Sequence, residues 1–195
     1  MLWFLVYILP QTQPSFNSMT KIYTKLGDQG KTSLINGVSL DKDDMIFDVI
    51  GNIDELNASI GITKSLLTNK NFIGKLQKIQ GFLFQLSGEI ADKKRILKNT
   101  KLISDVDIES LEKEMDEWNS KLAPLNNFLF PGSNKISALL HFSRTVCRRT
   151  ERSIVKCGKK EKIRPQLLKF INRLSDWLFV LARITSSDND KIWKA

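Results

Sequence analysis

Apolar residues recur at helical spacing over most of the chain and divide it into five periodic segments. The segments cover residues 51–67, 72–90, 105–120, 133–155 and 165–186. Short polar breaks separate them, so consecutive helices can pack against one another in opposite directions. The pattern predicts an all-α fold, an antiparallel five-helix bundle that follows a glycine-containing N-terminal loop.

Single residues predict how these helices begin and which side chains face inward. Ser104 or Asp105 is a good N-cap for the third helix, and Ser133 is one for the fourth. Gly81 lies inside the second helix, where it costs about 1 kcal/mol relative to alanine, so we expect a close helix crossing there. The inward candidates of the third helix are Val106, Leu111, Met115 and Trp118.

Composition limits the class of protein. The 195 residues carry a net charge of +9 and are 42% hydrophobic, which is ordinary for one globular domain and favours anionic ligands. No nucleic-acid-binding module is recognisable, so we expect no nucleic acid and no membrane partner. The two cysteines form no CxxC pair and there is one histidine, which argues against a conventional zinc or di-iron site. We expect a cytoplasmic protein with reduced thiols.

The first eighteen residues differ from the rest. An apolar stretch is followed by Pro10 and Pro14, without the positive flank of a signal peptide or the arginines of a mitochondrial leader. The stretch is also too short to span a bilayer. We interpret residues 1–18 as a disordered leader or an upstream mis-start, favoured over a targeting signal, and residues 19–195 as a single domain.

The fourth helix carries a row of arginines. Arg144, Arg148 and Arg152 are spaced four apart, so a helix places like charges next to one another, which is destabilising without a counter-charge. Guanidinium groups match the oxygens of phosphate, so the row favours a polyanion such as a nucleoside triphosphate. The alternative is a solvated basic face on which Glu151 is a local ion-pair partner.

The N-terminal loop offers further phosphate ligands. Its Gly30-Lys31-Thr32 sequence imitates the end of a phosphate-binding P-loop, but Lys25 stands where the first glycine of that motif belongs. Backbone donors and the side chains of Thr24, Lys25, Thr32 and Ser33 could still hold phosphate oxygens. A purely structural turn is the alternative.

Three other positions allow two readings. Asp54 suits the positive end of the first helix, and it could instead pair with an arginine of the row. Asn172 and Asp176 share a face of the fifth helix, where they could bind a ligand or form a polar edge. His141 is the only histidine and lies within the basic helix, which argues against a Ser-His-Asp triad and favours positioning and charge neutralisation.

Six motifs follow one another in an order and spacing that are specific as a set. From about residue 21 to 195 they closely resemble the ATP:cob(I)alamin adenosyltransferase family of the propanediol-utilisation type. The resemblance implies a homotrimer with ATP and cobalamin bound where subunits meet, and Mg²⁺ held through the ATP phosphates. It also implies a corrinoid reductase and an adenosylcobalamin-dependent enzyme as partners. The motifs cover residues 23–30, 42–44, 51–57, 128–132, 144–152 and 172–176.

The resemblance also implies roles for single residues. Phe128 would occupy the lower face of the corrin, displace the lower ligand of cobalt and leave a four-coordinate Co(II) that is easier to reduce. The Co(I) formed would attack the 5′ carbon of ATP and release triphosphate. Arg144 would pair with Asp54 across a subunit boundary, and Arg148 completes the implied catalytic set. The implied ATP-binding residues are Thr24, Lys25, Leu26, Gly27, Thr32, Ser33, Lys42, Arg148, Arg149, Thr150, Glu151, Arg152 and Asn172.

Two alternatives remain at this point. Phe128 read without the resemblance is a core residue, and the whole chain could be a non-catalytic ATP sensor or corrinoid chaperone, which would bind ATP without turnover. Departures from the family pattern bear on affinity and subunit contacts more than on the reaction class. They lie at Leu26, Ser39, Ile46, Ile50 and Ser133.

Overall fold

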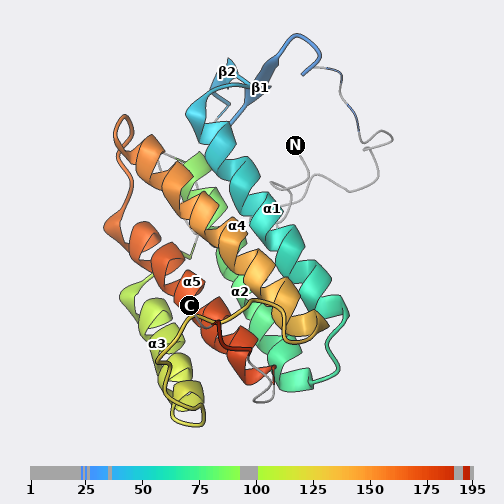
Figure 1. Ribbon diagram of the computed structural model, residues 1–195. Coiled ribbons are helices and arrows are strands. Elements are labelled where there is room, and N and C mark those ends of the chain that lie inside the picture. The colour runs from blue at the N-terminus through green and yellow to red at the C-terminus, as the bar shows by residue number, and fades with distance from the viewer. Residues whose placement is uncertain are drawn as a thin grey trace.

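Five helices make up most of the computed structural model, which describes residues 23, 25, 27–34, 37–92, 101–186 and 191–193 (Figure 1). The predicted leader, residues 1–18, lies outside the described residues. Among the described helices, none combines the length and the apolar character of a membrane span. The predicted five-helix bundle is confirmed, with α1 Met45–Ser65, α2 Lys70–Ala91, α3 Asp105–Asn119, α4 Lys135–Gly158 and α5 Pro165–Ile184.

The helices form a closed ring in which consecutive helices run in opposite directions. Helix α4 packs on both α1 and α5, α2 packs on α1, and α3 packs on α5. The contacts of α3 with α5 advance together along both chains, from Asp105 with Lys169 to Glu114 with Trp177, so these two helices are parallel. A ring of five alternating helices must contain one parallel pair, and this is that pair.

Capping residues correct two of the predicted helix starts. Helix α1 begins six residues earlier than predicted because the Asp44 side chain accepts a hydrogen bond from the Ile46 N–H at 2.9 Å. Helix α4 is capped by Asn134, whose Oδ1 accepts from the Ser137 N–H at 2.9 Å, and not by Ser133. The predicted cap at Ser104 is confirmed.

The core contains the apolar faces predicted for α2 and α5, with Trp177 fully buried against Trp118 at a ring distance of 5.2 Å. In α3 the prediction for Val106 is wrong, since its side chain is 72% exposed. Asp107 turns inward instead, because its carboxylate accepts from both the N–H and the hydroxyl of Ser104. The close crossing at Gly81 is also wrong: a Cβ there would meet no atom within 4 Å.

A small hairpin precedes the bundle and was not predicted. Strands β1 (Lys31–Ser33) and β2 (Ser39–Asp41) pair antiparallel, with Thr32 opposite Leu40. Leu34 is buried and Leu40 packs against the core, so the hairpin is fixed to the bundle. Strands of three residues are too short for an alternating apolar pattern to be visible in the sequence.

A buried ion pair joins two connections between helices. The Glu89 carboxylate accepts from the Arg164 Nη1 at 2.5 Å and from the Ile103 N–H at 2.6 Å. The Arg164 Nη2 in turn donates to the Ile103 carbonyl at 2.9 Å. The connection between α2 and α3 is therefore anchored at Ile103, which is fully buried; residues 93–100 lie outside the described residues.

We expect Glu89→Ala to lower the free energy of unfolding by about 3–5 kcal/mol, because it leaves the Arg164 charge and the Ile103 N–H without their acceptor. Urea unfolding followed by circular dichroism measures the change. The matched control is Glu109→Ala, which removes an exposed carboxylate of α3 and should change stability by less than about 0.5 kcal/mol. Equal losses in the two variants would contradict the role given to the buried pair.

Candidate functional site

The rotation of α4 about its own axis decides which of its side chains reach solvent. Val146, Thr150 and Ile154 are buried at spacings of four. The Thr150 hydroxyl lies 3.0 Å from the Asn52 carbonyl oxygen of α1. Arg149 also contacts α1, through an ion pair with Glu55 and a hydrogen bond from Nε to the Asn52 side chain at 3.2 Å. Arg149 and Thr150 thus hold α4 on α1, and Thr150 lies inside that contact.

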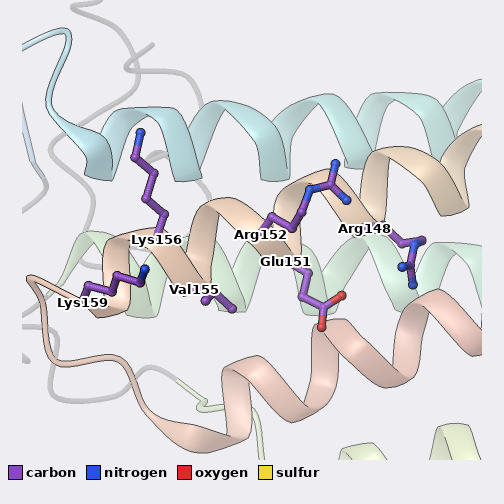
Figure 2. A pocket seen from close by; sticks show the side chains of 6 residues that line it. All are labelled: Arg148, Glu151, Arg152, Val155, Lys156 and Lys159. Atoms are coloured by element: carbon purple, nitrogen blue, oxygen red, sulfur yellow. The ribbon is translucent and has the colours of Figure 1, made fainter.

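Two arginines of the row, Arg148 and Arg152, line a cleft in the second half of α4 (Figure 2). The cleft has a volume of about 410 Å³. Within the described part of the chain, the side chains of Arg148 and Arg152 have no hydrogen-bond or ion-pair partner. The alternative in which Glu151 neutralises this face is not supported. The lining residues are Arg148, Glu151, Arg152, Val155, Lys156 and Lys159.

Helix α5 contributes a polar contact at the edge of this cleft. The Asn172 amide nitrogen donates to Glu151 Oε1 at 2.9 Å, so Asn172 lies beside the arginine row as predicted. Asp176, one turn further on, is 3.6 Å from Arg173 of its own helix. The two residues share a helix face but have different partners. Glu151 is thereby turned toward α5 and does not cancel the charge of the row.

The Arg144 guanidinium lacks part of its hydrogen bonding among the described residues. Its Nε is buried without a hydrogen-bond acceptor, and its guanidinium carbon lies 6.0 Å from the ring centre of Phe179. Burial, and secondly the charge of Arg148, hold the pKa of Arg144 below its ordinary value. Loss of hydration likewise raises the pKa of Asp54, and no ion pair joins it to Arg144 among the described residues. The Arg144 guanidinium and the Asp54 carboxylate are thus both partly desolvated, and neither has an ion-pair partner among the described residues.

The N-terminal segment brings two of the predicted ATP ligands, Gly27 and Lys42, together. The Lys42 ammonium lies over Gly27, only 3.0 Å from where a Cβ of that residue would be. The Lys42 N–H donates to the Gly30 carbonyl at 2.8 Å, and Gly30 has the positive φ of 77° that glycine tolerates. Lys25 has a left-handed backbone, with φ 59°. Thr32 and Ser33 belong to β1, whereas Thr24 and Leu26 lie outside the described residues.

The hairpin and the cleft lie at the same end of the bundle. Figure 1 places β1 and β2 beyond the N-terminal end of α1, at the end where α4 finishes. Because α4 runs antiparallel to α1, its second half, which carries the cleft, is the half nearest that end. The structure therefore gathers basic loop residues and the arginine row toward one pole of the molecule.

Phe128 is a surface residue. Its side chain is 78% exposed, so the interpretation as core is wrong. Its segment pairs with the C-terminal residues: the Trp193 N–H donates to the Phe128 carbonyl at 2.8 Å, and Leu129 bridges to Ile192. The Trp193 ring meets Phe128 edge to face with centroids 6.2 Å apart. Sequence reasoning missed Trp193, since no periodic signal connects a residue near the C-terminus to this loop.

Among the described residues, no cysteine, serine, threonine or histidine lines the cleft. The Cys147 thiol is buried and lies 3.3 Å from the Ile171 carbonyl oxygen, and burial raises its pKa above the ordinary value. His141 is buried and packs on Phe179 at 5.8 Å. Among the described residues, no group of His, Cys, Asp or Glu could hold a metal ion. Four of the six lining residues are cations, which favours an anionic ligand in the cleft.

The departures from the family pattern have structural positions. Ile46 and Ile50 are buried in the first turns of α1, where they contribute to the core. Ser39 pairs with Ser33 across the hairpin, and Ser133 immediately precedes the Asn134 cap. None of these four residues lines the cleft. Leu26 lies outside the described residues.

Comparison with known proteins identifies relatives of the whole domain. A family model described as cobalamin adenosyltransferase matches residues 22–185. The chain is similar to corrinoid adenosyltransferase MMAB of Homo sapiens, with 40% identity over 181 residues that cover 89% of this chain and 72% of the relative. It is also similar to a corrinoid adenosyltransferase of Citrobacter freundii, with 37% identity over 88% of this chain and 98% of the relative.

A solved structure has the same fold. It is a variant of a PduO-type ATP:corrinoid adenosyltransferase from Lactobacillus reuteri complexed with cobalamin and ATP. The two chains superpose with a TM-score of 0.84 at 33% identity, over 89% of this chain and 97% of the other. A further variant from the same source, complexed with ATP, gives a TM-score of 0.82 over 89% of this chain and 100% of the other.

Proposed function

We infer the function from family membership, because the chain belongs to the cobalamin adenosyltransferase family. The protein transfers the 5′-deoxyadenosyl group of ATP to the cobalt of cob(I)alamin, giving adenosylcobalamin and triphosphate. The observation in this chain that best supports the inference is the cleft lined by Arg148 and Arg152, whose charges lack partners among the described residues.

This chemistry needs no nucleophile from the protein, because cobalt(I) itself is the nucleophile. The cobalt(I) electron pair forms the Co–C bond to the 5′ carbon while the bond from that carbon to oxygen breaks, and the departing electron pair remains on triphosphate. No protein base takes part. Arg148 and Arg152 would stabilise the charge that develops on the leaving group. Each charged hydrogen bond of this kind contributes roughly 1.5–3 kcal/mol.

The N-terminal loop would hold the other side of the nucleotide. Gly27 brings a backbone without a Cβ beside the Lys42 ammonium, which suits close approach of a phosphate. We propose the same role for Thr24, Lys25, Leu26, Thr32 and Ser33, with Mg²⁺ held through the phosphates. Glu151 and Asn172 would orient the nucleotide from α4 and α5. Arg149 and Thr150 act indirectly, because they fix the rotation of α4.

Phe128 supplies an apolar surface that suits a corrin ring. An aromatic side chain that is 78% exposed is unusual unless a partner covers it. The paired segment of residues 191–193 and the Trp193 ring limit its freedom. We propose that Phe128 occupies the lower face of the corrin in place of the lower ligand of cobalt.

A homotrimer would complete the site. The buried Arg144 Nε lacks an acceptor in the described part of the chain, and Asp54 is an exposed carboxylate without a described partner. Pairing of the two between neighbouring subunits would satisfy both groups. The corrinoid reductase, the adenosylcobalamin-dependent enzyme, the cytoplasmic location and the identity of residues 1–18 as a leader stay predictions.

Anaerobic mixing of the purified chain with ATP and chemically reduced cob(I)alamin tests the transferase directly. We expect a corrinoid product whose spectrum reverts on illumination, together with released triphosphate. Arg148→Ala should lower turnover by about 10²–10³-fold with an unchanged circular dichroism spectrum, because it removes charge stabilisation of the leaving group. Lys113→Ala, on the exposed face of α3, is the control. ATP binding without product in the wild type would favour the sensor or chaperone.

Phe128→Ala should lower turnover of cobalamin more than turnover of cobinamide, a corrinoid that has no lower base to displace. The physical reason is that only cobalamin needs a side chain to compete with its own lower ligand. Steady-state kinetics with both corrinoids measures the ratio. An equal loss with the two substrates would show that Phe128 acts in some other way.

Arg144→Asp and Asp54→Arg should each weaken the assembly, because each places like charges against one another at the proposed contact. The double variant reverses the pair and should recover association. Sedimentation velocity at micromolar concentration distinguishes trimer from monomer. Undisturbed assembly in both single variants, or a monomeric wild type, would refute the contact.

A further inference from the structure

The cleft extends beyond the arginine row toward the C-terminal end of α4. Lys156 continues the row at the next four-residue step after Arg152, and Lys159 follows three residues later. Both lysines line the cleft together with Arg148 and Arg152 (Figure 2). Four cations therefore line the cleft, and the two arginines supply half of them.

These lysines have no ion-pair partner among the residues that the structure describes. Within the residues that the structure describes, neither ammonium group takes part in a hydrogen bond or an ion pair. The one acidic residue of the cleft, Glu151, is hydrogen-bonded to Asn172. Figure 2 shows Glu151 pointing toward α5, whereas Lys156 extends on the side of α1. A run of like charges at four-residue spacing costs free energy unless an anion occupies the cleft.

The C-terminal end of a helix is itself favourable for cations, and this accounts for part of the pattern. The effect is confined to the last turn, which includes Lys156 but neither arginine. The favourable interaction of cations with a helix C-terminus also does not require the lysines to line a concave surface. Lys160 and Lys162 are exposed nearby without lining the cleft, so a basic C-terminal region does not by itself form the site.

The chemistry of the reaction identifies a suitable anion. Breaking the bond between the 5′ carbon and oxygen leaves an additional negative charge on triphosphate, so the product is a denser polyanion than the same three phosphates in ATP. A cleft lined by cations from successive turns of one helix suits a chain of phosphates. Val155 is the one apolar residue of the lining, which leaves few contacts for a purine ring.

We propose that Lys156 and Lys159 form a subsite for the terminal phosphates of ATP, and that they hold triphosphate after adenosyl transfer. The inference rests on the proposed function and adds two residues to the nucleotide site. The lysines bind phosphate without taking part in the displacement at carbon. Their loss therefore weakens retention of triphosphate more than it slows the chemical step.

Binding of inorganic triphosphate to the full chain tests the subsite without requiring turnover. The variant is Lys156→Ala with Lys159→Ala, and the matched control is Lys160→Ala with Lys162→Ala, which removes the same charge outside the cleft. Titration calorimetry should show the Kd for triphosphate rising by at least about tenfold in the cleft variant, because two charge-assisted contacts are lost. The control should change it by less than about twofold.

Product inhibition separates this proposal from the proposed function. In the adenosyltransferase assay, triphosphate should inhibit the cleft variant more weakly than the control, by a similar factor of about ten. Equal inhibition and equal Kd in the two variants, with an active wild type, would overturn the subsite and leave the transferase intact. Weaker binding of adenosine with unchanged binding of triphosphate would also overturn it, since the cleft would then hold the nucleoside.

Discussion

The contact between α1 and α4 is the constraint on which the rest of the site depends. The Thr150 hydroxyl lies at hydrogen-bonding distance from the Asn52 carbonyl, and Arg149 reaches both Asn52 and Glu55. Since buried residues recur at every helical turn on this side, α4 cannot rotate without exposing them. The arginine row is thereby kept on the adjoining face. One arginine of the run holds the helix, so that its neighbours stay available for a ligand.

Keeping several cations without partners requires stability from elsewhere. The Glu89–Arg164 pair and the Trp118–Trp177 contact stabilise the connections and the α3 side of the bundle, and none of these four residues lines the cleft. The charged groups of those regions are mutually paired, as in Lys75 with Glu114. The charges that stabilise the fold are therefore separate from the unpaired charges that could bind a ligand. The buried, unsatisfied Nε of Arg144 belongs to the second group.

Much of this arrangement follows from apolar periodicity, and the failures have separable causes. The five helices and the inward faces of α2 and α5 were predicted because burial repeats with the helical turn. Val106 was misplaced because a capping box turned Asp107 inward against the apolar pattern. The hairpin was not predicted because its strands have three residues each. The position of Phe128 depends on a long-range contact with Trp193, and nothing local in the sequence encodes such a contact.

The sequence identifies the proposed site residues as an ordered set of motifs. The structure divides them into basic residues around a cleft and exposed aromatic residues elsewhere. An adenosyl transfer to cobalt needs positive charge around triphosphate and an apolar surface against the corrin. One surface cannot easily provide both, because cations retain water. The chain draws the two surfaces from different segments. Charge comes from the second half of α4 and from the loop that holds Lys42, whereas exposed aromatic area comes from the paired segments that carry Phe128 and Trp193. Under the proposed function, the arginine row and the exposed phenylalanine, each ambiguous alone, would meet the two parts of this requirement.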